Sequence, residues 1–224
     1  MEESFWHRCW DEGRIGFHQS DINARLVSCW PGIGAAPGAT VFVPLCGKSR
    51  DMLWLRERGH PVLGVELSER AVAAFFDENR LAHERTVSSL GTEYRSTGDG
   101  PSLRLIAGNY FALSPADLDG VGALYDRASL IAMNDALRER YAVQLGRVVP
   151  AGARGLLLVS DHDTAQMQGP PFAVSDTMVR ALLDQAFELE EIERHSGAER
   201  LGNLAKRGLE SLTEHVFRLV RRSD

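Results

Sequence analysis

The chain lacks the features of a membrane-anchored or disulfide-stabilised protein. No apolar run among its 224 residues approaches the length of a membrane span, and its acidic, aromatic N-terminus, MEESFWHRCW, is not typical of a signal peptide. Its three cysteines, Cys9, Cys29 and Cys46, are odd in number and show no C-x-x-C spacing, so we expect neither a disulfide framework nor a zinc site. These absences favour a cytoplasmic protein with no metal centre and no membrane partner.

Positive charge is also in short supply. Lys and Arg together number 25 against 31 Asp and Glu, which gives a net charge of −6 and a sequence pI of about 5.7. We therefore expect no extended basic surface, which argues against nucleic acid as a partner. Hydrophobic residues make up 44% of the chain, enough to bury a large core, and the length suits a single domain.

Glycine is scarce in a turn where nucleotide-binding proteins often concentrate it. The segment 40–66, TVFVPLCGKSRDMLWLRERGHPVLGVE, is typical of a strand, a turn at Gly47, a helix and a second strand ending in Glu66. The spacing from Gly47 to Glu66 matches the roughly 20 residues between the glycine turn of a βαβ unit and its ribose-binding acid. A carboxylate there can accept hydrogen bonds from both ribose hydroxyls, so we predict a ligand with an adenosine-like end.

The missing glycines narrow the choice of ligand. The turn has no complete G-x-G-x-x-G, and its Gly-Lys-Ser triplet does not form a P-loop because Phe42 stands where the first glycine should be. Extra glycines allow the backbone to approach a pyrophosphate, so this turn favours a ligand without one, such as S-adenosylmethionine. The plain alternative is a βαβ unit whose acid lies on the surface and binds nothing.

Hydrophobic periodicity divides the chain into alternating helices and strands. We expect helices at 4–12, 22–30 (with Asp21 as N-cap), 51–58, after Ser68, 134–148 and 174–187. We expect strands at 40–45, 61–65, 121–125, 155–160, 188–193 and 212–220, and a hairpin over 92–106 that turns at 98–100. This order predicts an α/β fold with a doubly wound, seven-stranded, mostly parallel sheet, helices on both faces and an antiparallel last strand, as in class I methyltransferases.

The expected sheet also indicates where a ligand would bind. In doubly wound sheets, ligands lie at the carboxyl ends of the strands, where the strand order switches. The residues at these ends are Leu45, Glu66, 108–111, Asp126-Arg127 and 161–163. We expect the functional residues to be among them.

Five segments of the chain match one family in the order of that family. They are FWHRCWDEGRIGFHQ at 5–19, VFVPLCGKSRDMLWLRERGHPVLGVELSERAVAAFF at 41–76, GNYFAL at 108–113, YDRASLIAMN at 125–134 and GPPF at 169–172. On these segments, which span most of the chain, it resembles the bacterial thiopurine S-methyltransferases. The PLCGK turn joined to GVELSE is specific to that pattern, whereas the C-terminal segment matches loosely.

The resemblance implies an activity and a set of ligands. It implies methyl transfer from S-adenosylmethionine to the sulfur of aromatic or heterocyclic thiols such as thiopurines, or to selenium or tellurium compounds, by direct in-line displacement that leaves S-adenosylhomocysteine. Because such a reaction depends chiefly on alignment, we expect no single essential catalytic acid or base. It further implies one methyltransferase domain over 1–224, with a helical N-terminal cover at 1–37 and an α/β core at 38–224. We expect a monomer.

The resemblance also implies roles for particular positions. The residues that would contact the methyl donor are Trp10, Leu45, Glu66 and Arg127, with Tyr110 and Phe111 beside its adenine. Phe17 would line the acceptor pocket, and Arg127 could instead stabilise acceptor charge. A C-terminal basic residue near the acceptor is left open among Arg200, Lys206 and Arg207.

Each of these positions has a structural alternative. Trp10 could simply dock its helix on the body, and Leu45 could simply be buried. Tyr110 and Phe111 could be core aromatics, and Arg127 could be paired with Asp126 or another acid. Three further features invite a catalytic reading that we do not adopt: we expect a surface role for His18, a substrate-side loop at 161–163 and an inert buried thiol at Cys46.

Two other functions remain to be distinguished. A dinucleotide-dependent oxidoreductase could use a similar βαβ unit, although the incomplete glycine turn and the antiparallel ending count against it. A non-catalytic protein of the same fold could bind S-adenosylmethionine or an oxyanion. Phe17 and Arg127 together favour the enzyme over this binding protein.

Overall fold

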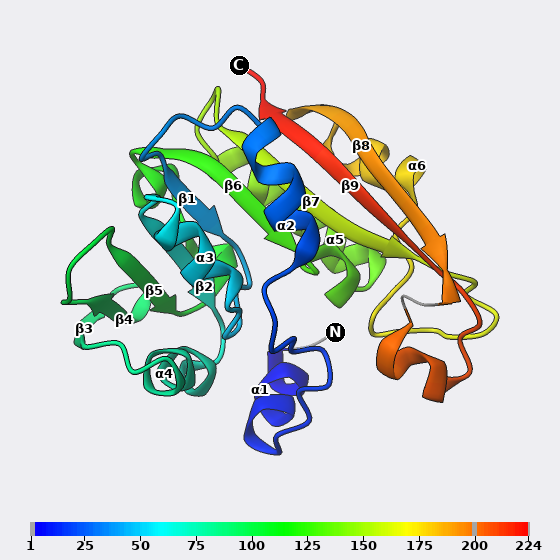
Figure 1. The fold of residues 1–224 in the computed structure, drawn as a ribbon, viewed down its shortest axis with the longest axis horizontal. Helices are drawn as coiled ribbons and strands as arrows, with labels where there is room; N and C mark the ends of the chain where they lie inside the picture. The colour runs from blue at the N-terminus through cyan, green and yellow to red at the C-terminus, as the bar shows by residue number, and fades with distance from the viewer. Residues whose placement is uncertain (1–2, 199–200, 224) are drawn as a thin grey trace.

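The protein is built on one mixed sheet. The computed structural model describes residues 3–198 and 201–223, and within them the sheet has nine strands in the order β3-β4-β5-β2-β1-β6-β7-β9-β8 (Figure 1). The strands are β1 Thr40–Val43, β2 Val62–Glu66, β3 His83–Ser88, β4 Gly91–Ser96, β5 Leu103–Ala107, β6 Val121–Arg127, β7 Arg154–Asp161, β8 Phe187–Gly197 and β9 Leu212–Arg221. The helices are α1 Glu3–Asp11, α2 Ala24–Cys29, α3 Asp51–Glu57, α4 Glu69–Glu78, α5 Asp135–Val148 and α6 Asp176–Leu183.

The strand directions confirm the expected fold. The strands β5, β2, β1, β6 and β7 are parallel neighbours, and β9 pairs antiparallel with both β7 and β8. The seven strands from β5 to β8 are the expected sheet, and the count of seven is corrected to nine by β3 and β4, which continue it antiparallel beyond β5. The predicted hairpin between β4 and β5 is confirmed, but β3 was not predicted, because its 83–88 segment is almost wholly exposed and has no buried alternation.

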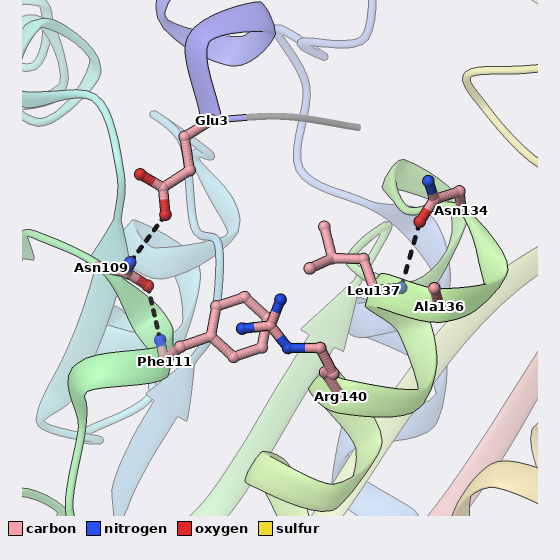
Figure 2. A pocket seen from close by; sticks show the side chains of 7 residues that line it. All are labelled: Glu3, Asn109, Phe111, Asn134, Ala136, Leu137 and Arg140. Carbon is pink, nitrogen blue, oxygen red and sulfur yellow. Dashed lines mark hydrogen bonds between the residues drawn. The ribbon is translucent and has the colours of Figure 1, made fainter.

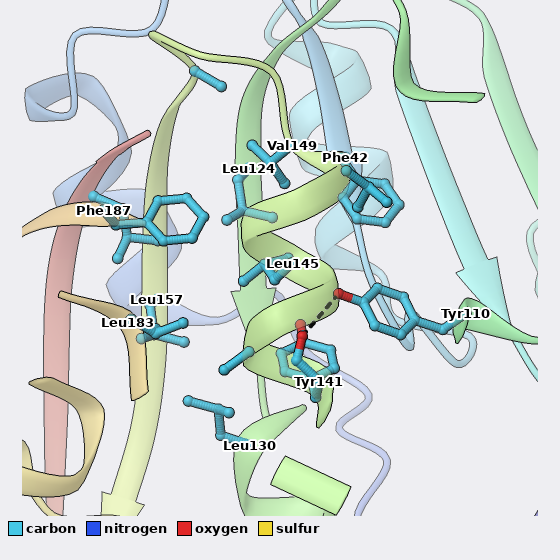
Figure 3. Close-up of a cluster of buried hydrophobic side chains, with 14 of the residues drawn as sticks. Phe42, Tyr110, Leu124, Leu130, Tyr141, Leu145, Val149, Leu157, Leu183 and Phe187 are labelled. Atoms are coloured by element: carbon cyan, nitrogen blue, oxygen red, sulfur yellow. Dashed lines mark hydrogen bonds between the residues drawn. The ribbon is translucent and has the colours of Figure 1, made fainter. Parts of the chain in front are cut away.

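Helices cover both faces of the sheet and define two cores. On one face α5 and α6 pack against alternate residues of β1, β6 and β7, around Phe42, Leu124, Tyr141 and Leu157 (Figure 3). On the other face α2, α3 and α4 pack against the intervening residues, around Val41, Phe75 and Leu156. The alternation explains why β1 and β2 are nearly continuous apolar runs: strands covered on both sides bury all of their residues here except Thr40, which is half-buried.

The two α-helices that precede β1 have different surroundings. The helix α1 lies at the carboxyl edge of the parallel strands, whereas α2 packs on a face of the sheet (Figure 1), with Leu26 and Cys29 in its core. The expected N-cap at Asp21 is wrong. Asn23 caps α2, because its side-chain oxygen accepts hydrogen bonds from the backbone N–H groups of Arg25 and Leu26.

The C-terminal elements depart most from expectation. The helix expected over 174–187 is only Asp176–Leu183, capped by Ser175, and the last two strands are longer than expected. The loop between them contains a 3₁₀ helix, Gly202–Arg207, and its Leu201 and Leu209 form a small separate cluster with Met167, which follows β7, and Leu212 of β9. These short turns carry no hydrophobic periodicity, so the sequence could not reveal them.

Candidate functional site

Glu66 lies where the ribose-binding acid of a βαβ unit is expected. It is the last residue of β2 and is 7% exposed. One carboxylate oxygen accepts from the backbone N–H of Gly47 at 3.0 Å and the other from that of Ser68 at 2.9 Å. Burial raises the pKa of Glu66, and these two N–H groups oppose that rise without cancelling it. The acid is therefore fixed against the glycine turn, and each oxygen keeps accepting capacity for a ligand hydroxyl.

The turns after β1 and β6 leave the sheet in an unusual conformation. Leu45 has a φ of 46° and Ala128 a φ of 70°, both in the left-handed region that favours glycine. The two strands are neighbours in the sheet, with Phe42 opposite Leu124. The strand order reverses between them, since the chain runs from β1 outward through β2 and β5 and then returns to β6. The strained residues therefore mark the switch point where ligands bind in such sheets.

An aromatic cluster on and beside α1 covers the glycine turn. Trp10 is 6% exposed, and a Cβ built on Gly47 would lie 3.4 Å from its indole. Phe17 packs edge-on against both Trp10 and Trp6, with ring centroids 5.5 Å apart in each pair, yet it remains 47% exposed. Trp10, predicted to contact the methyl donor, and Phe17, predicted to line the acceptor pocket, are thus in contact above the carboxyl edge of β1.

A pocket opens beside this cover. It has a volume of about 400 Å³ and is lined by one residue of α1, two after β5 and four at the start of α5: Glu3, Asn109, Phe111, Asn134, Ala136, Leu137 and Arg140 (Figure 2). The side chain of Asn109 donates to Glu3 at 2.8 Å and accepts from the N–H of Phe111 at 2.8 Å. The Arg140 guanidinium lies 4.8 Å from the Phe111 ring centroid. The pocket offers a flat aromatic wall and amide groups, which suit a heterocycle.

Tyr110 and Phe111 have different surroundings, although they were predicted as a pair. Phe111 lines the pocket, whereas the ring of Tyr110 is 5% exposed and stacks on Tyr141 and Phe42 in the core (Figure 3). For Tyr110 the structural alternative therefore describes the side chain. A position beside adenine stays a prediction for Phe111 and, through the backbone, for Tyr110.

Arg127 ends β6 and is held by several partners. Its Nε donates to Asp51 at 2.8 Å, one terminal nitrogen to Ser49 at 3.1 Å and the other to Gln19 at 3.3 Å. The ion pair considered above therefore exists, and the acid is Asp51. Asp126 points to the opposite face of the sheet, where it accepts from the Tyr141 hydroxyl at 2.6 Å. Leu45 packs against that same opposite core, partly buried at the end of β1.

The C-terminal basic residues remain unassigned. Arg200 lies outside the described residues, and Lys206 is exposed. Arg207 donates to the Pro170 carbonyl at 2.6 Å, which fastens the 3₁₀ helix to the GPPF segment at 169–172. Phe172 of that segment donates its backbone N–H to the carbonyl of Ile131, close after β6, at 2.7 Å. The C-terminal loop is thereby tied toward the same edge of the sheet.

Several residues with potential chemistry are placed in ordinary surroundings. Cys46 is buried, and burial raises the pKa of its thiol well above the usual value, as expected of an inert thiol. Burial, then the charge of Lys48, lowers the pKa of His18. The side chain of Asp161 bonds the backbone N–H of His162 at 2.9 Å. Over residues 3–198 and 201–223, no three His, Cys, Asp or Glu side chains are grouped to hold a metal ion.

Sequence reasoning missed two residues of this site. Asp51 was read only as part of a helix, because an acid in the first turn is already favoured by the helix dipole. Asn109 was passed over for the aromatics that follow it, although an Asn before a 3₁₀ turn signals a cap. In both cases a local role in capping or helix charge concealed a long-range contact.

Asp126 yields a prediction about stability. It is fully buried, and burial raises its pKa from 3.8 to about 6, against the opposing hydrogen bonds from Tyr141 and Ser129. A carboxyl whose folded-state pKa is raised stabilises the fold below its unfolded-state pKa and loses that contribution as pH rises. We expect the wild-type free energy of unfolding to fall by about 2 kcal/mol, relative to Asp126→Asn, between about pH 4 and pH 7. Urea unfolding of both proteins across this range measures the difference, and parallel pH profiles would contradict it.

Comparison with known proteins places this geometry in a family. The family model described as Thiopurine S-methyltransferase (TPMT) matches residues 1–222. A curated thiopurine S-methyltransferase of Azotobacter vinelandii is 46% identical over 222 residues, covering 99% of this chain and 100% of that protein. None of the described helices combines the length and the apolar character needed to cross a membrane.

Solved structures share the fold at low sequence identity. One, described as "Conversion of a Disulfide Bond into a Thioacetal Group during Echinomycin Biosynthesis", has a TM-score of 0.66 at 17% identity and covers 99% of this chain and 93% of its own. Another is Haemonchus contortus phosphoethanolamine N-methyltransferase 2 in complex with S-adenosyl-L-methionine. It has a TM-score of 0.61 at 10% identity and covers 99% of this chain and 58% of its own.

Proposed function

Because the chain belongs to the thiopurine S-methyltransferase family, we propose that it methylates the sulfur of small aromatic or heterocyclic thiols. It is an enzyme, and its methyl donor is S-adenosylmethionine. When bound, that donor supplies an electrophilic methyl group open to direct attack by a thiolate. The observation that carries the proposal is the Glu66 carboxylate, held by two backbone N–H groups at the end of β2 as a ribose-binding acid would be.

The proposed binding mode follows the edge of the sheet. Glu66 binds the ribose hydroxyls, and the pocket between Phe111 and the start of α5 holds the adenine. Trp10 and Leu45 enclose the methionine end of the donor. Phe17 faces the acceptor, since it is the exposed member of the aromatic cluster. The indole of Trp10 lies over Gly47, which supports a donor without a pyrophosphate at this turn.

The protein's contribution to catalysis would be alignment and exclusion of water. The aromatic cluster closes over the turn, and the terminal nitrogens of Arg127 offer positive charge to the donor's carboxylate or to an anionic acceptor. Effective molarities of about 10⁵ to 10⁸ M mark what alignment alone can supply. Heterocyclic thiols ionise near neutral pH, so no general base is required. Selenium and tellurium compounds would occupy the acceptor position beside Phe17, as the thiols would.

The remaining proposals concern context. We propose that the enzyme works as a monomer in the cytoplasm. Residues 1–224 would form one methyltransferase domain, in which α1 and the 13–20 loop act as the cover and α2 belongs to the body.

The function is tested by binding and turnover measured separately. Titration calorimetry should show S-adenosylhomocysteine binding and no NAD binding, because the glycine-poor turn does not accommodate a pyrophosphate. Methyl transfer from S-adenosylmethionine should then be found with 6-mercaptopurine, and selenite serves as the metalloid probe. Donor binding without transfer to any thiol would support the non-catalytic binding protein, and NAD binding would support the oxidoreductase.

A further inference from the structure

A buried acid joins the N-terminal segment to the arginine of the site. Asp51, the first residue of α3, is completely buried. Its Oδ1 accepts from the backbone N–H of Asn23 at 2.8 Å, and its Oδ2 accepts from the Tyr125 hydroxyl at 2.9 Å and from Nε of Arg127 at 2.8 Å. One carboxylate thus connects the start of α2, the first turn of α3 and the end of β6.

This acid fixes the orientation of the Arg127 guanidinium. Its Nε is bound by Asp51, while Ser49 and Gln19 each take one N–H from a terminal nitrogen. Each of these acceptors takes one of the two N–H groups on its terminal nitrogen, and the Tyr125 hydroxyl also lies against the guanidinium. Because the Nε side is occupied, an anion can engage the fork only through these terminal nitrogens.

We propose that Asp51 is a positioning residue, which aims Arg127 at the anionic group of the bound ligand and fastens the N-terminal segment in the same step. The proposal rests on the proposed function, in which Arg127 meets the donor's carboxylate or an anionic acceptor. A buried carboxylate is costly to leave without partners, and Asp51 has three donors on two other segments: the backbone N–H of Asn23 before α2, and the side chains of Tyr125 and Arg127 on β6.

The geometry makes Asp51→Asn a sharp substitution. Asn has nearly the same shape, but its amide nitrogen must face either the Asn23 N–H or the Arg127 Nε–H, and both of these groups are donors. Either orientation leaves a donor without an acceptor, and the second releases the guanidinium. The matched control is Asp126→Asn, which makes the same change at a fully buried acid one residue before Arg127, on the opposite face of the sheet.

The test is a double-mutant cycle with two readouts. S-adenosylhomocysteine affinity is measured by calorimetry, and acceptor KM and kcat are measured with 6-mercaptopurine, for wild type, Asp51→Asn, Arg127→Lys and the double variant. We expect Asp51→Asn to weaken the same parameter as Arg127→Lys, by about 10- to 100-fold, since small misplacements of a positioned group have effects of that size. In the double variant, the affected parameter should be reduced no more than in the single variant with the larger loss. Asp126→Asn should leave both donor affinity and the acceptor kinetic parameters unchanged.

Each outcome decides the question. Losses that multiply in the double variant, or an Asp51→Asn protein that binds and turns over like Asp126→Asn, would overturn the positioning role. If Asp51→Asn shows no cooperative thermal unfolding, Ser49→Ala takes its place in the cycle. A Ser49→Ala protein that loses a parameter which Arg127→Lys leaves unaffected would likewise count against the proposal. A wild-type protein without donor binding or transfer refutes the proposed function instead, so the two failures are distinguishable.

Discussion

Replacement of Glu66 by Gln should lower the affinity for S-adenosylhomocysteine by on the order of 100-fold. Hydrogen bonds to an ionised group contribute about 1.5–3 kcal/mol each, and the carboxylate would accept from both ribose hydroxyls. In the wild type, the N–H groups of Gly47 and Ser68 donate to the carboxylate of Glu66. Gln would direct its amide nitrogen toward one of these two donors, which would lose its acceptor, so the turn itself would be disturbed. Titration calorimetry at neutral pH measures the effect.

The matched control for Glu66 is Glu93→Gln. Glu93, on β4, is buried to a similar degree, 8% exposed, but it pairs with Arg95 of β4 and Arg104 of β5, away from the switch point. The Glu93→Gln variant should be less stable than the wild type but should bind S-adenosylhomocysteine with the wild-type affinity. Because burial raises the pKa of Glu66, wild-type affinity should also decline as pH falls through that raised value. Unchanged affinity in Glu66→Gln would remove the basis of the proposed binding mode.

Replacement of Trp10 by Ala should detach the N-terminal cover. The indole is a buried contact of α1 with the glycine turn, and the helix is also linked by hydrogen bonds from Asn109 to Glu3 and from Arg70 to the carbonyl of Asp11. A buried Trp→Ala change costs about 3–5 kcal/mol, more than these hydrogen bonds can offset. We expect α1 to become accessible to limited proteolysis and donor affinity to fall by at least tenfold, since 1.4 kcal/mol corresponds to about that factor.

The Trp6→Ala variant distinguishes the two proposed roles of the aromatic cluster, which are contact with the donor through Trp10 and contact with the acceptor through Phe17. Trp6 lies one turn earlier on α1, contacts Phe5 and Phe17, and is not the residue over Gly47. It should raise acceptor KM through Phe17 while donor affinity stays near the wild-type value. Equal losses of donor affinity in the two variants would mean that Trp10 only docks the helix and has no separate contact with the donor.

The central part of the fold could be predicted because its signals are local. Buried parallel strands read as apolar runs, helix starts carry capping residues such as Ser68, and the distance from Gly47 to Glu66 follows from the dimensions of one βαβ unit. The structure places Glu66 against the glycine turn, as the spacing indicated. The hairpin before β5 was equally accessible through its Gly-Asp-Gly turn.

The remainder could not be predicted because its determinants are distant in sequence. The contact of Asp51 with Arg127 spans 76 positions, and that of Asn109 with Glu3 spans 106. Pattern reasoning placed Asp51 in a helix and Arg127 at the end of a strand, which is correct, but it carries no information on which side chains converge. The edge strand β3 was not predicted for another reason. Its exposed residues show no alternation of buried and exposed positions, and its strand conformation depends on pairing with β4.

The backbone at the end of β1 and β6 has a consequence for precision. Leu45 and Ala128 adopt a conformation that glycine would reach with less strain, yet neither position is glycine. A glycine in either turn would sample a wider range of angles, whereas a residue with a Cβ is confined to a narrow well once it is there. Each of these two turns costs about 1 kcal/mol of backbone strain and restricts the backbone to a narrow range of angles. A ligand bound between the two turns is therefore held with smaller thermal displacements.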